Sequence, residues 1–93
     1  MPKEVENLIE IARIKILAIK AHVIKIAQKE HGILVYLDKD NIQIDEIGIN
    51  NLVKKYGPRI RFSPGVETYI TLKTDEKDEK KVIGDIKELL SSL

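Results

Sequence analysis

Apolar residues between positions 3 and 21 recur at the three- and four-residue spacing of an amphipathic helix. A helix that is apolar on two sides has to be covered on both, so we expect this one to be internal. The wider of its two rows should face the domain, and the narrower row whatever precedes Pro2 in a longer chain; alternatively, Ile11 and Ile14 are scattered exposed residues. The wider row contains Val5, Leu8, Ile9, Ala12, Ile16 and Ile19, and the narrower row contains Ile11, Ile14, Ala18 and Ala21.

The middle of the chain carries apolar patterns with the period of two that half-buried β-strands show. Residues 23–28 and 33–37 form a predicted hairpin, in which Gly32 is expected to supply a positive φ at the turn. Residues 59–63 and 67–73 form a second predicted hairpin around a Pro-Gly turn. Since residues 33–37 are apolar on both faces, we expect that strand to be central in the sheet.

Two further helices are predicted from their caps and apolar spacing. One begins after the N-cap residue Asp45 and is stopped by Gly57 and Pro58. The last is capped by Thr74 or Asp75 and carries one apolar stripe toward the C-terminus. Gly48 lies inside the first of these two helices, and nothing local in the sequence explains it. Close packing of another backbone against this position would explain it.

The predicted order of elements is α-β-β-α-β-β-α. Two hairpins with apolar faces and three helices with matching stripes favour an α+β fold, a mostly antiparallel four-stranded sheet packed by the three helices. Ninety-three residues with 43% hydrophobic content suit a single domain with one core. The order of the strands stays open at this point.

Composition narrows the classes of function. Sixteen Lys and Arg against fifteen Asp and Glu give no global field to attract nucleic acid, so any charge-driven binding must be local. The absence of cysteine fits a reducing compartment. No apolar run approaches the ~20 residues of a membrane span, and the N-terminus lacks the apolar core of a signal peptide. We therefore expect a cytoplasmic protein without membrane association, and its start almost directly in a helix suggests an excised fragment.

No motif predicts catalysis, and we expect no catalytic, cofactor-binding or metal-binding residues. Phosphate loops, dinucleotide-binding turns and nucleophile elbows are all missing from the sequence. His22 and His31 lack the cluster of Cys, His and carboxylates that a metal site needs. Four carboxylates near the start of the last helix are better explained as charges that complement the helix dipole, namely Asp75, Glu76, Asp78 and Glu79.

A candidate partner-binding surface lies on the first helix, where acidic residues flank the narrower apolar row. Such a combination could meet a basic partner surface with an apolar centre. The alternative is a solvated helix flank in which Glu10 pairs with Arg13 at i,i+3 spacing. The candidate residues are Glu6, Glu10, Ile11, Ile14 and Ala18.

A local basic patch offers an alternative nucleic-acid site. Tyr56 and Phe62 lie near it in sequence, so phosphate contact could be combined with base stacking. The other explanation is that the lysines complement the end of a helix, the arginines point outward from a strand and both aromatic rings belong to the core. The residues of this patch are Lys54, Lys55, Arg59 and Arg61.

The run of residues 2–15, PKEVENLIEIARIK, resembles the start of the helix in the C-terminal domain of bacterial transcription-repair coupling factors (Mfd), with its Pro-x-Glu-Val and Ile-Ala-Arg core. The resemblance continues to the end of the chain as a pattern of elements, and its motifs are packing signatures. One departure is the helix end, where the family often has Leu-Gly and this chain has Ala21-His22. The C-cap is therefore less clearly marked.

The resemblance implies a specific role. The family's proteins are ATP-driven DNA translocases that recognise stalled RNA polymerase and recruit UvrA for nucleotide excision repair of DNA damage. Their C-terminal domain packs on the UvrA-binding module and keeps the free enzyme inhibited. The implied function is thus a non-catalytic regulatory and protein-interaction domain, with the other domains of the parent as partners and UvrA and RNA polymerase reached only through the parent. The alternative is a small nucleic-acid-binding module, and weak self-association through an uncovered apolar row is also expected.

Overall fold

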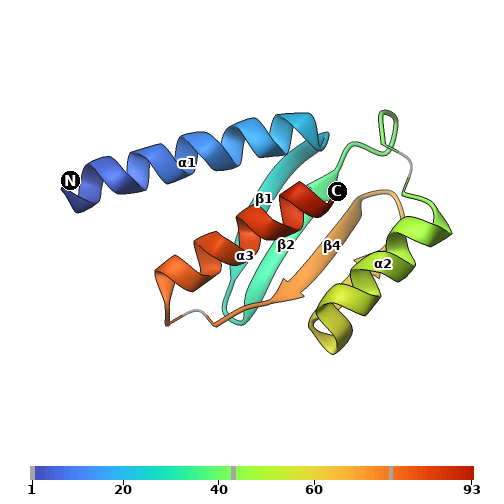
Figure 1. Ribbon diagram of the computed structural model, residues 1–93. Helices are drawn as coiled ribbons and strands as arrows, with labels where there is room; N and C mark the ends of the chain where they lie inside the picture. The colour runs from blue at the N-terminus through green and yellow to red at the C-terminus, as the bar shows by residue number, and fades with distance from the viewer. Residues whose placement is uncertain (1, 43, 76) are drawn as a thin grey trace.

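Helices α2 and α3 lie on one face of a four-stranded antiparallel sheet, and α1 runs beside α3 at the β1 edge of the sheet (Figure 1). The computed structural model describes residues 2–42, 44–75 and 77–93. The sheet has the strand order β1-β2-β4-β3, so β2 is central as predicted. The predicted α+β class and order of elements are confirmed. The elements are α1 (Lys3–Lys20), β1 (Val23–Lys29), β2 (Gly32–Leu37), α2 (Glu46–Tyr56), the 3-10 turn η1 (Gly57–Arg59), β3 (Ile60–Ser63), β4 (Thr68–Lys73) and α3 (Glu79–Ser92).

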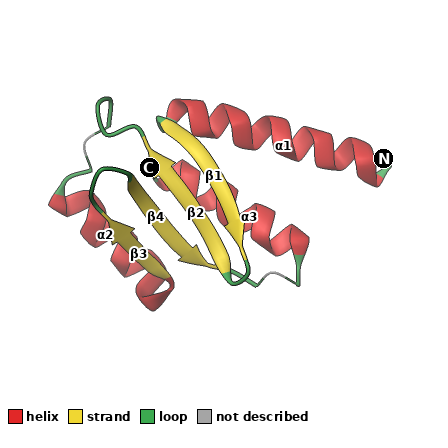
Figure 2. Ribbon diagram, turned by 180° about the vertical axis from the view of Figure 1, so that it is seen from behind, coloured by secondary structure: helices red, strands yellow, loops and turns green. Residues whose placement is uncertain are grey.

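The core lies between the sheet and helices α2 and α3. Alternate residues of the two central strands point toward the helices, so the residues between them lie on the opposite face of the sheet. Figure 2 views the molecule from that opposite side, where no helix stands in front of the strands. The buried core residues are Ile33, Val35, Leu37, Leu52, Tyr56, Ile70, Leu72, Val82, Leu89 and Leu90.

Helix α1 packs the opposite way round from the prediction. Ile14, Leu17 and Ala18, from the side of the narrower row, pack against the core, and Ala21 beyond the helix is buried. The wider row faces solvent, with Leu8 66% exposed. The prediction was wrong because helical spacing defines two stripes without saying which one meets the domain. Small residues such as Ala18 and Ala21 allow α1 to approach β1 and α3 closely.

Local chemistry explains the helix ends. Asp45 caps α2 as predicted, its Oδ1 accepting a hydrogen bond of 2.8 Å from the backbone N–H of Gly48. A Cβ at Gly48 would lie 3.3 Å from that same Oδ1, so the glycine leaves room for the cap rather than for another backbone. The predicted cap of α3 is wrong: Asp78 accepts from the N–H of Lys81, while Asp75 closes a separate turn. Glu76 lies outside the described residues.

Two details of the first hairpin differ from the prediction. Gly32 does not have a positive φ; it begins β2, where a Cβ would lie 2.6 Å from the carbonyl oxygen of Leu72. Close approach of two backbones therefore explains this glycine. The expected alternation also fails at Ile24, which is 69% exposed, because the register of β1 shifts between Val23 and Lys25.

Candidate interaction surface on the first helix

Helix α1 carries a row of large apolar side chains that the rest of the chain leaves uncovered. No residue of α1 is fully buried, and its packed side contacts α3 and β1. At 1.5 Å per residue the uncovered row is about 21 Å long. Contiguous apolar surface of this kind marks an interaction site in a folded protein. We call it the α1 stripe, made of Val5 (42% exposed), Leu8 (66%), Ile9 (37%), Ile16 (54%) and Ile19 (74%), with Ala12 between them.

Charges border the α1 stripe in an ordered way. The acidic residues Glu4 and Glu6 lie in the first turn, whereas Arg13, Lys15 and Lys20 belong to the second half of the helix. The N-terminal half of the stripe is thus bordered by negative charge and the C-terminal half by positive charge. A complementary surface would be apolar along its centre, with basic groups facing the start of α1 and acidic groups facing its end.

An ion pair joins α1 to α3 on the side away from the stripe. Lys87 Nζ lies 2.6 Å from Glu10 Oε2, and Arg13 donates to Glu10 Oε1 at 3.4 Å as the i,i+3 spacing predicted. The hydrogen bond from Lys87 is the main reason why the pKa of Glu10 lies below its ordinary value. Glu10 therefore links α1 to α3.

The structure does not bring the predicted partner-binding residues together on one free surface. Ile14 and Ala18 pack against the core, and Glu10 is paired with Lys87. Glu6 and Ile11 are exposed, the latter by 48%. The residues that do form a free apolar surface belong to the wider row. Its spacing was visible in the sequence, but nothing local showed that it faces outward.

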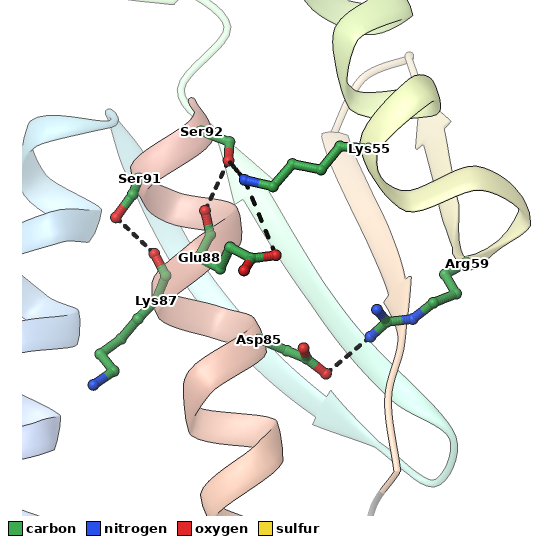
Figure 3. A network of polar contacts seen from close by, with 7 residues as sticks. All are labelled: Lys55, Arg59, Asp85, Lys87, Glu88, Ser91 and Ser92. Carbon is green, nitrogen blue, oxygen red and sulfur yellow. Dashed lines mark hydrogen bonds and ion pairs between the residues drawn. The ribbon is translucent and has the colours of Figure 1, made fainter.

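The predicted basic patch is also divided (Figure 3). Arg59 binds Asp85 of α3 at 2.9 Å and donates to the carbonyl oxygen of Lys73, while Lys55 donates to Ser92 at 2.7 Å. Lys54 is exposed on α2, whereas Arg61 points to the opposite face of the sheet. These four cations therefore form no common surface, and two of them hold α3 in place.

The two aromatic residues near that patch, Tyr56 and Phe62, belong to the core. This agrees with the second of the two explanations given for the patch from the sequence. Tyr56 is 5% exposed, and burial raises the pKa of its hydroxyl. Phe62 packs against the same core cluster. The cations of Lys55 and Arg59 lie 5.5 and 5.9 Å from the ring centre of Tyr56, so they cover this ring rather than a ligand.

The described ranges 2–42, 44–75 and 77–93 hold no cluster of three or more His, Asp or Glu residues arranged to bind a metal ion. The carboxylate of Asp38 is used within its own loop, where the hydrogen bond from Asn41 at 2.6 Å is the main cause of its lowered pKa. None of the described helices has the length and hydropathy required to cross a membrane.

Comparison with known families supplies the identity of the domain. Among curated proteins, none matches the chain significantly. A family model described as the TRCF domain matches residues 1–58, which is more than half of the chain. The matched part contains α1, the β1–β2 hairpin and α2. The α1 stripe therefore lies inside the matched region, and the chain belongs to the TRCF domain family, a domain of transcription-repair coupling factors.

Proposed function

We propose that this chain is a non-catalytic interaction domain from the C-terminal part of a cytoplasmic, ATP-driven DNA translocase, and that it docks on another domain of the same protein through the α1 stripe. The exposure of that stripe carries the proposal. Leu8, Ile16 and Ile19 are each more than half exposed, whereas the apolar residues through which α2 and α3 pack on the sheet are buried. Covering apolar surface gains ~25 cal/mol per Å², so the uncovered stripe favours association.

The acceptor that fits this family is the UvrA-binding module of the parent translocase. A domain seated there would cover surface that UvrA needs and would keep the free enzyme inhibited. Release would then be a population shift between a packed and an unpacked state. Stalled RNA polymerase and UvrA would act on the parent protein, and this domain would respond through that equilibrium during nucleotide excision repair.

The size of the stripe suits a reversible contact. One helix face is smaller than the ~800 Å² per partner that stable complexes of separate proteins bury. Within one chain, however, the linker raises the effective concentration of the partner to the millimolar range. A contact too weak to hold two free proteins together can therefore hold two tethered domains together and still be displaced by a competitor.

Fluorescence anisotropy of the labelled chain, titrated with a recombinant UvrA-binding module from a transcription-repair coupling factor, tests the proposal. We expect saturable binding that the double substitution Ile16→Lys and Ile19→Lys weakens at least ~10-fold, because two charges would be desolvated. The control for adding a lysine at an exposed apolar position is Ile47→Lys on α2, where the isoleucine is 70% exposed. Thermal melts should show that all variants remain folded.

Two results would count against the proposal. If the module fails to bind at millimolar concentration, or if Ile47→Lys weakens binding as much as the stripe variant, the α1 stripe is not the docking surface. UvrA added to the complex should displace the chain. Simultaneous binding of both to the module would keep the interaction but exclude inhibition by competition.

A further inference from the structure

The face of the sheet turned away from the helices has a composition of its own. The strand register places its side chains in rows that run across the sheet, two of them over all four strands and one over β1, β2 and β4. Figure 2 shows this side of the sheet without a covering helix. One row contains Lys25, Tyr36, Tyr69 and Ser63, the next contains Ala27, Leu34, Thr71 and Arg61, and the last contains Lys29, Gly32 and Lys73.

Two tyrosines form the centre of this face. Tyr36 and Tyr69 stand opposite each other on the two central strands, with ring centres 5.3 Å apart and planes inclined by 39°. Both are half-buried, so part of each ring remains accessible. Lys25 extends over the Tyr36 ring, its Nζ lying 5.1 Å from the ring centre. The face therefore offers aromatic surface next to a cation.

The charge on this face is one-sided. None of the strand residues that point to it is acidic, whereas four are basic, namely Lys25, Lys29, Arg61 and Lys73. All four are exposed. On the helix side, by contrast, Arg59, Lys55 and Lys87 are engaged with carboxylates of the domain. A nearly neutral chain thus presents a locally basic sheet.

Acidic residues lie beyond both ends of this face: Glu30 follows Lys29 and Asp75 follows Lys73 at one end, and three more border the other end. Asp38, Asp40 and Glu67 border a hollow of ≈ 240 Å³ together with Lys25 and Tyr36. Phosphate groups would be repelled beyond either end and attracted to the cations on the strands themselves. A polyanion would therefore cross the strands beside the two rings rather than extend past the ends of the sheet.

We propose that this open sheet face binds single-stranded nucleic acid. Its bases would stack on Tyr36 and Tyr69, and its phosphates would be held by the four cations Lys25, Lys29, Arg61 and Lys73. Single strands expose the faces of their bases, which stack on aromatic side chains on open sheets and in grooves. A duplex hides its bases, so a flat sheet with central rings discriminates against it. The site shares no residue with the α1 stripe, so it is independent of domain docking.

The test is fluorescence anisotropy with labelled oligo(dT) and oligo(U) of ~10 nucleotides and a duplex of equal length, between ~50 and ~200 mM salt. We expect both single strands to bind more tightly than the duplex. Lys25→Ala with Arg61→Ala should flatten the log–log salt dependence by ~1.4, since each phosphate contact contributes ~0.7 on single strands. The matched control is Lys54→Ala with Lys80→Ala, which removes the same charge from exposed positions on α2 and α3.

Stacking has a separate readout. Tyr36→Leu and Tyr69→Leu keep an apolar cover on the sheet and should each weaken binding about fivefold or more without changing the salt slope. The chain has three tyrosines and no tryptophan, and Tyr56 is buried. Quenching of tyrosine fluorescence by oligo(dT) therefore reports on Tyr36 and Tyr69 in the unaltered protein, even if a leucine variant fails to fold.

Several results would overturn the proposal. These are equal affinity for duplex and single strands, an equal loss in the control pair, unchanged tyrosine fluorescence at saturation, or no binding at low salt. A preference for oligo(U) or for oligo(dT) would support the site and show which of the two strands it accepts better.

Discussion

Helices α1 and α3 both carry apolar residues at helical spacing, α1 in two rows and α3 in one stripe, but they pack differently. Helix α3 buries Val82, Leu89 and Leu90 beneath a polar outer surface. Helix α1 has no fully buried residue and turns its larger apolar side chains outward. Apolar periodicity thus reports how many sides of a helix are apolar, but which of them meets the core depends on the neighbouring elements. The apolar side that the domain leaves uncovered is the side available to another domain.

The largest expected effect is a difference in stability between two Leu→Ala substitutions. Leu89 of α3 is fully buried, so Leu89→Ala should cost ~2–5 kcal/mol through lost contacts and the cavity left behind. Leu8 of α1 is 66% exposed, and Leu8→Ala should change the free energy of unfolding by less than ~0.5 kcal/mol. Urea denaturation of both variants measures the two costs.

The comparison of α1 with α3 would fail if both variants lost similar stability. That result would mean that Leu8 is covered in solution, by self-association or by a different packing of α1. Sedimentation equilibrium of the unaltered chain separates these cases, because only self-association depends on protein concentration.

A smaller effect is expected at the end of α1, where the chain lacks the usual glycine. His22 has a φ of 57°, in the left-handed region that favours glycine. This backbone conformation costs a residue with a Cβ roughly 1–2 kcal/mol, and the greater freedom of glycine in the unfolded chain offsets part of the gain. His22→Gly should therefore stabilise the domain by ~0.5 kcal/mol.

Gly57→Ala is the comparison at the residue after α2, where φ is 59° and ψ is −134°. A Cβ at Gly57 would meet no atom within 4 Å, so its cost should come from the backbone alone, at about 1–3 kcal/mol. Thermal melts that showed a loss of stability for His22→Gly would mean that the imidazole makes a contribution larger than the backbone strain.

Much of the fold follows from local chemistry that the sequence displays. Alternation defined the strands, and Asp45 predicted the start of α2 because a carboxylate there can accept the N–H of Gly48. The start of α3 was misplaced because the chain offers several acidic residues in a row, and only the geometry of the loop selects Asp78. The sequence indicates that a glycine is needed at position 32. The cause is the close approach of the β4 backbone, which lies far along the chain.

The surfaces were less predictable than the elements. Lys25 and Arg61 come from the two edge strands and share a face only because the strand order is β1-β2-β4-β3. Arg59 was expected to point outward, but it is drawn to Asp85 of α3. The narrower row of α1 packs inward because α1 contacts α3, and no local sequence pattern shows that contact. Sites assembled from several elements therefore needed the tertiary structure.

The smallest expected effect concerns the ion pair that joins α1 to α3. The hydrogen bond from Lys87 keeps the pKa of Glu10 below its ordinary value of 4.5, against a smaller opposing effect of burial, and Lys87 and Arg13 add attraction. Because the folded state lowers this pKa, the pair stabilises the domain fully above pH 4.5 and loses its effect as the pH falls through the folded value. Solvent screening keeps the contribution modest.

Glu10→Gln should therefore lower the stability of the domain at neutral pH, and the difference from the unaltered chain should shrink below pH 4.5. Glu67→Gln, in the exposed turn before β4, is the control for removing one carboxylate. Urea denaturation at a series of pH values measures both. A difference that persisted unchanged at pH 2 to 3, below the range in which carboxylates titrate, would show that Glu10 stabilises the joint by packing alone. The position of α1, and with it the outward direction of its stripe, would then not depend on this charge.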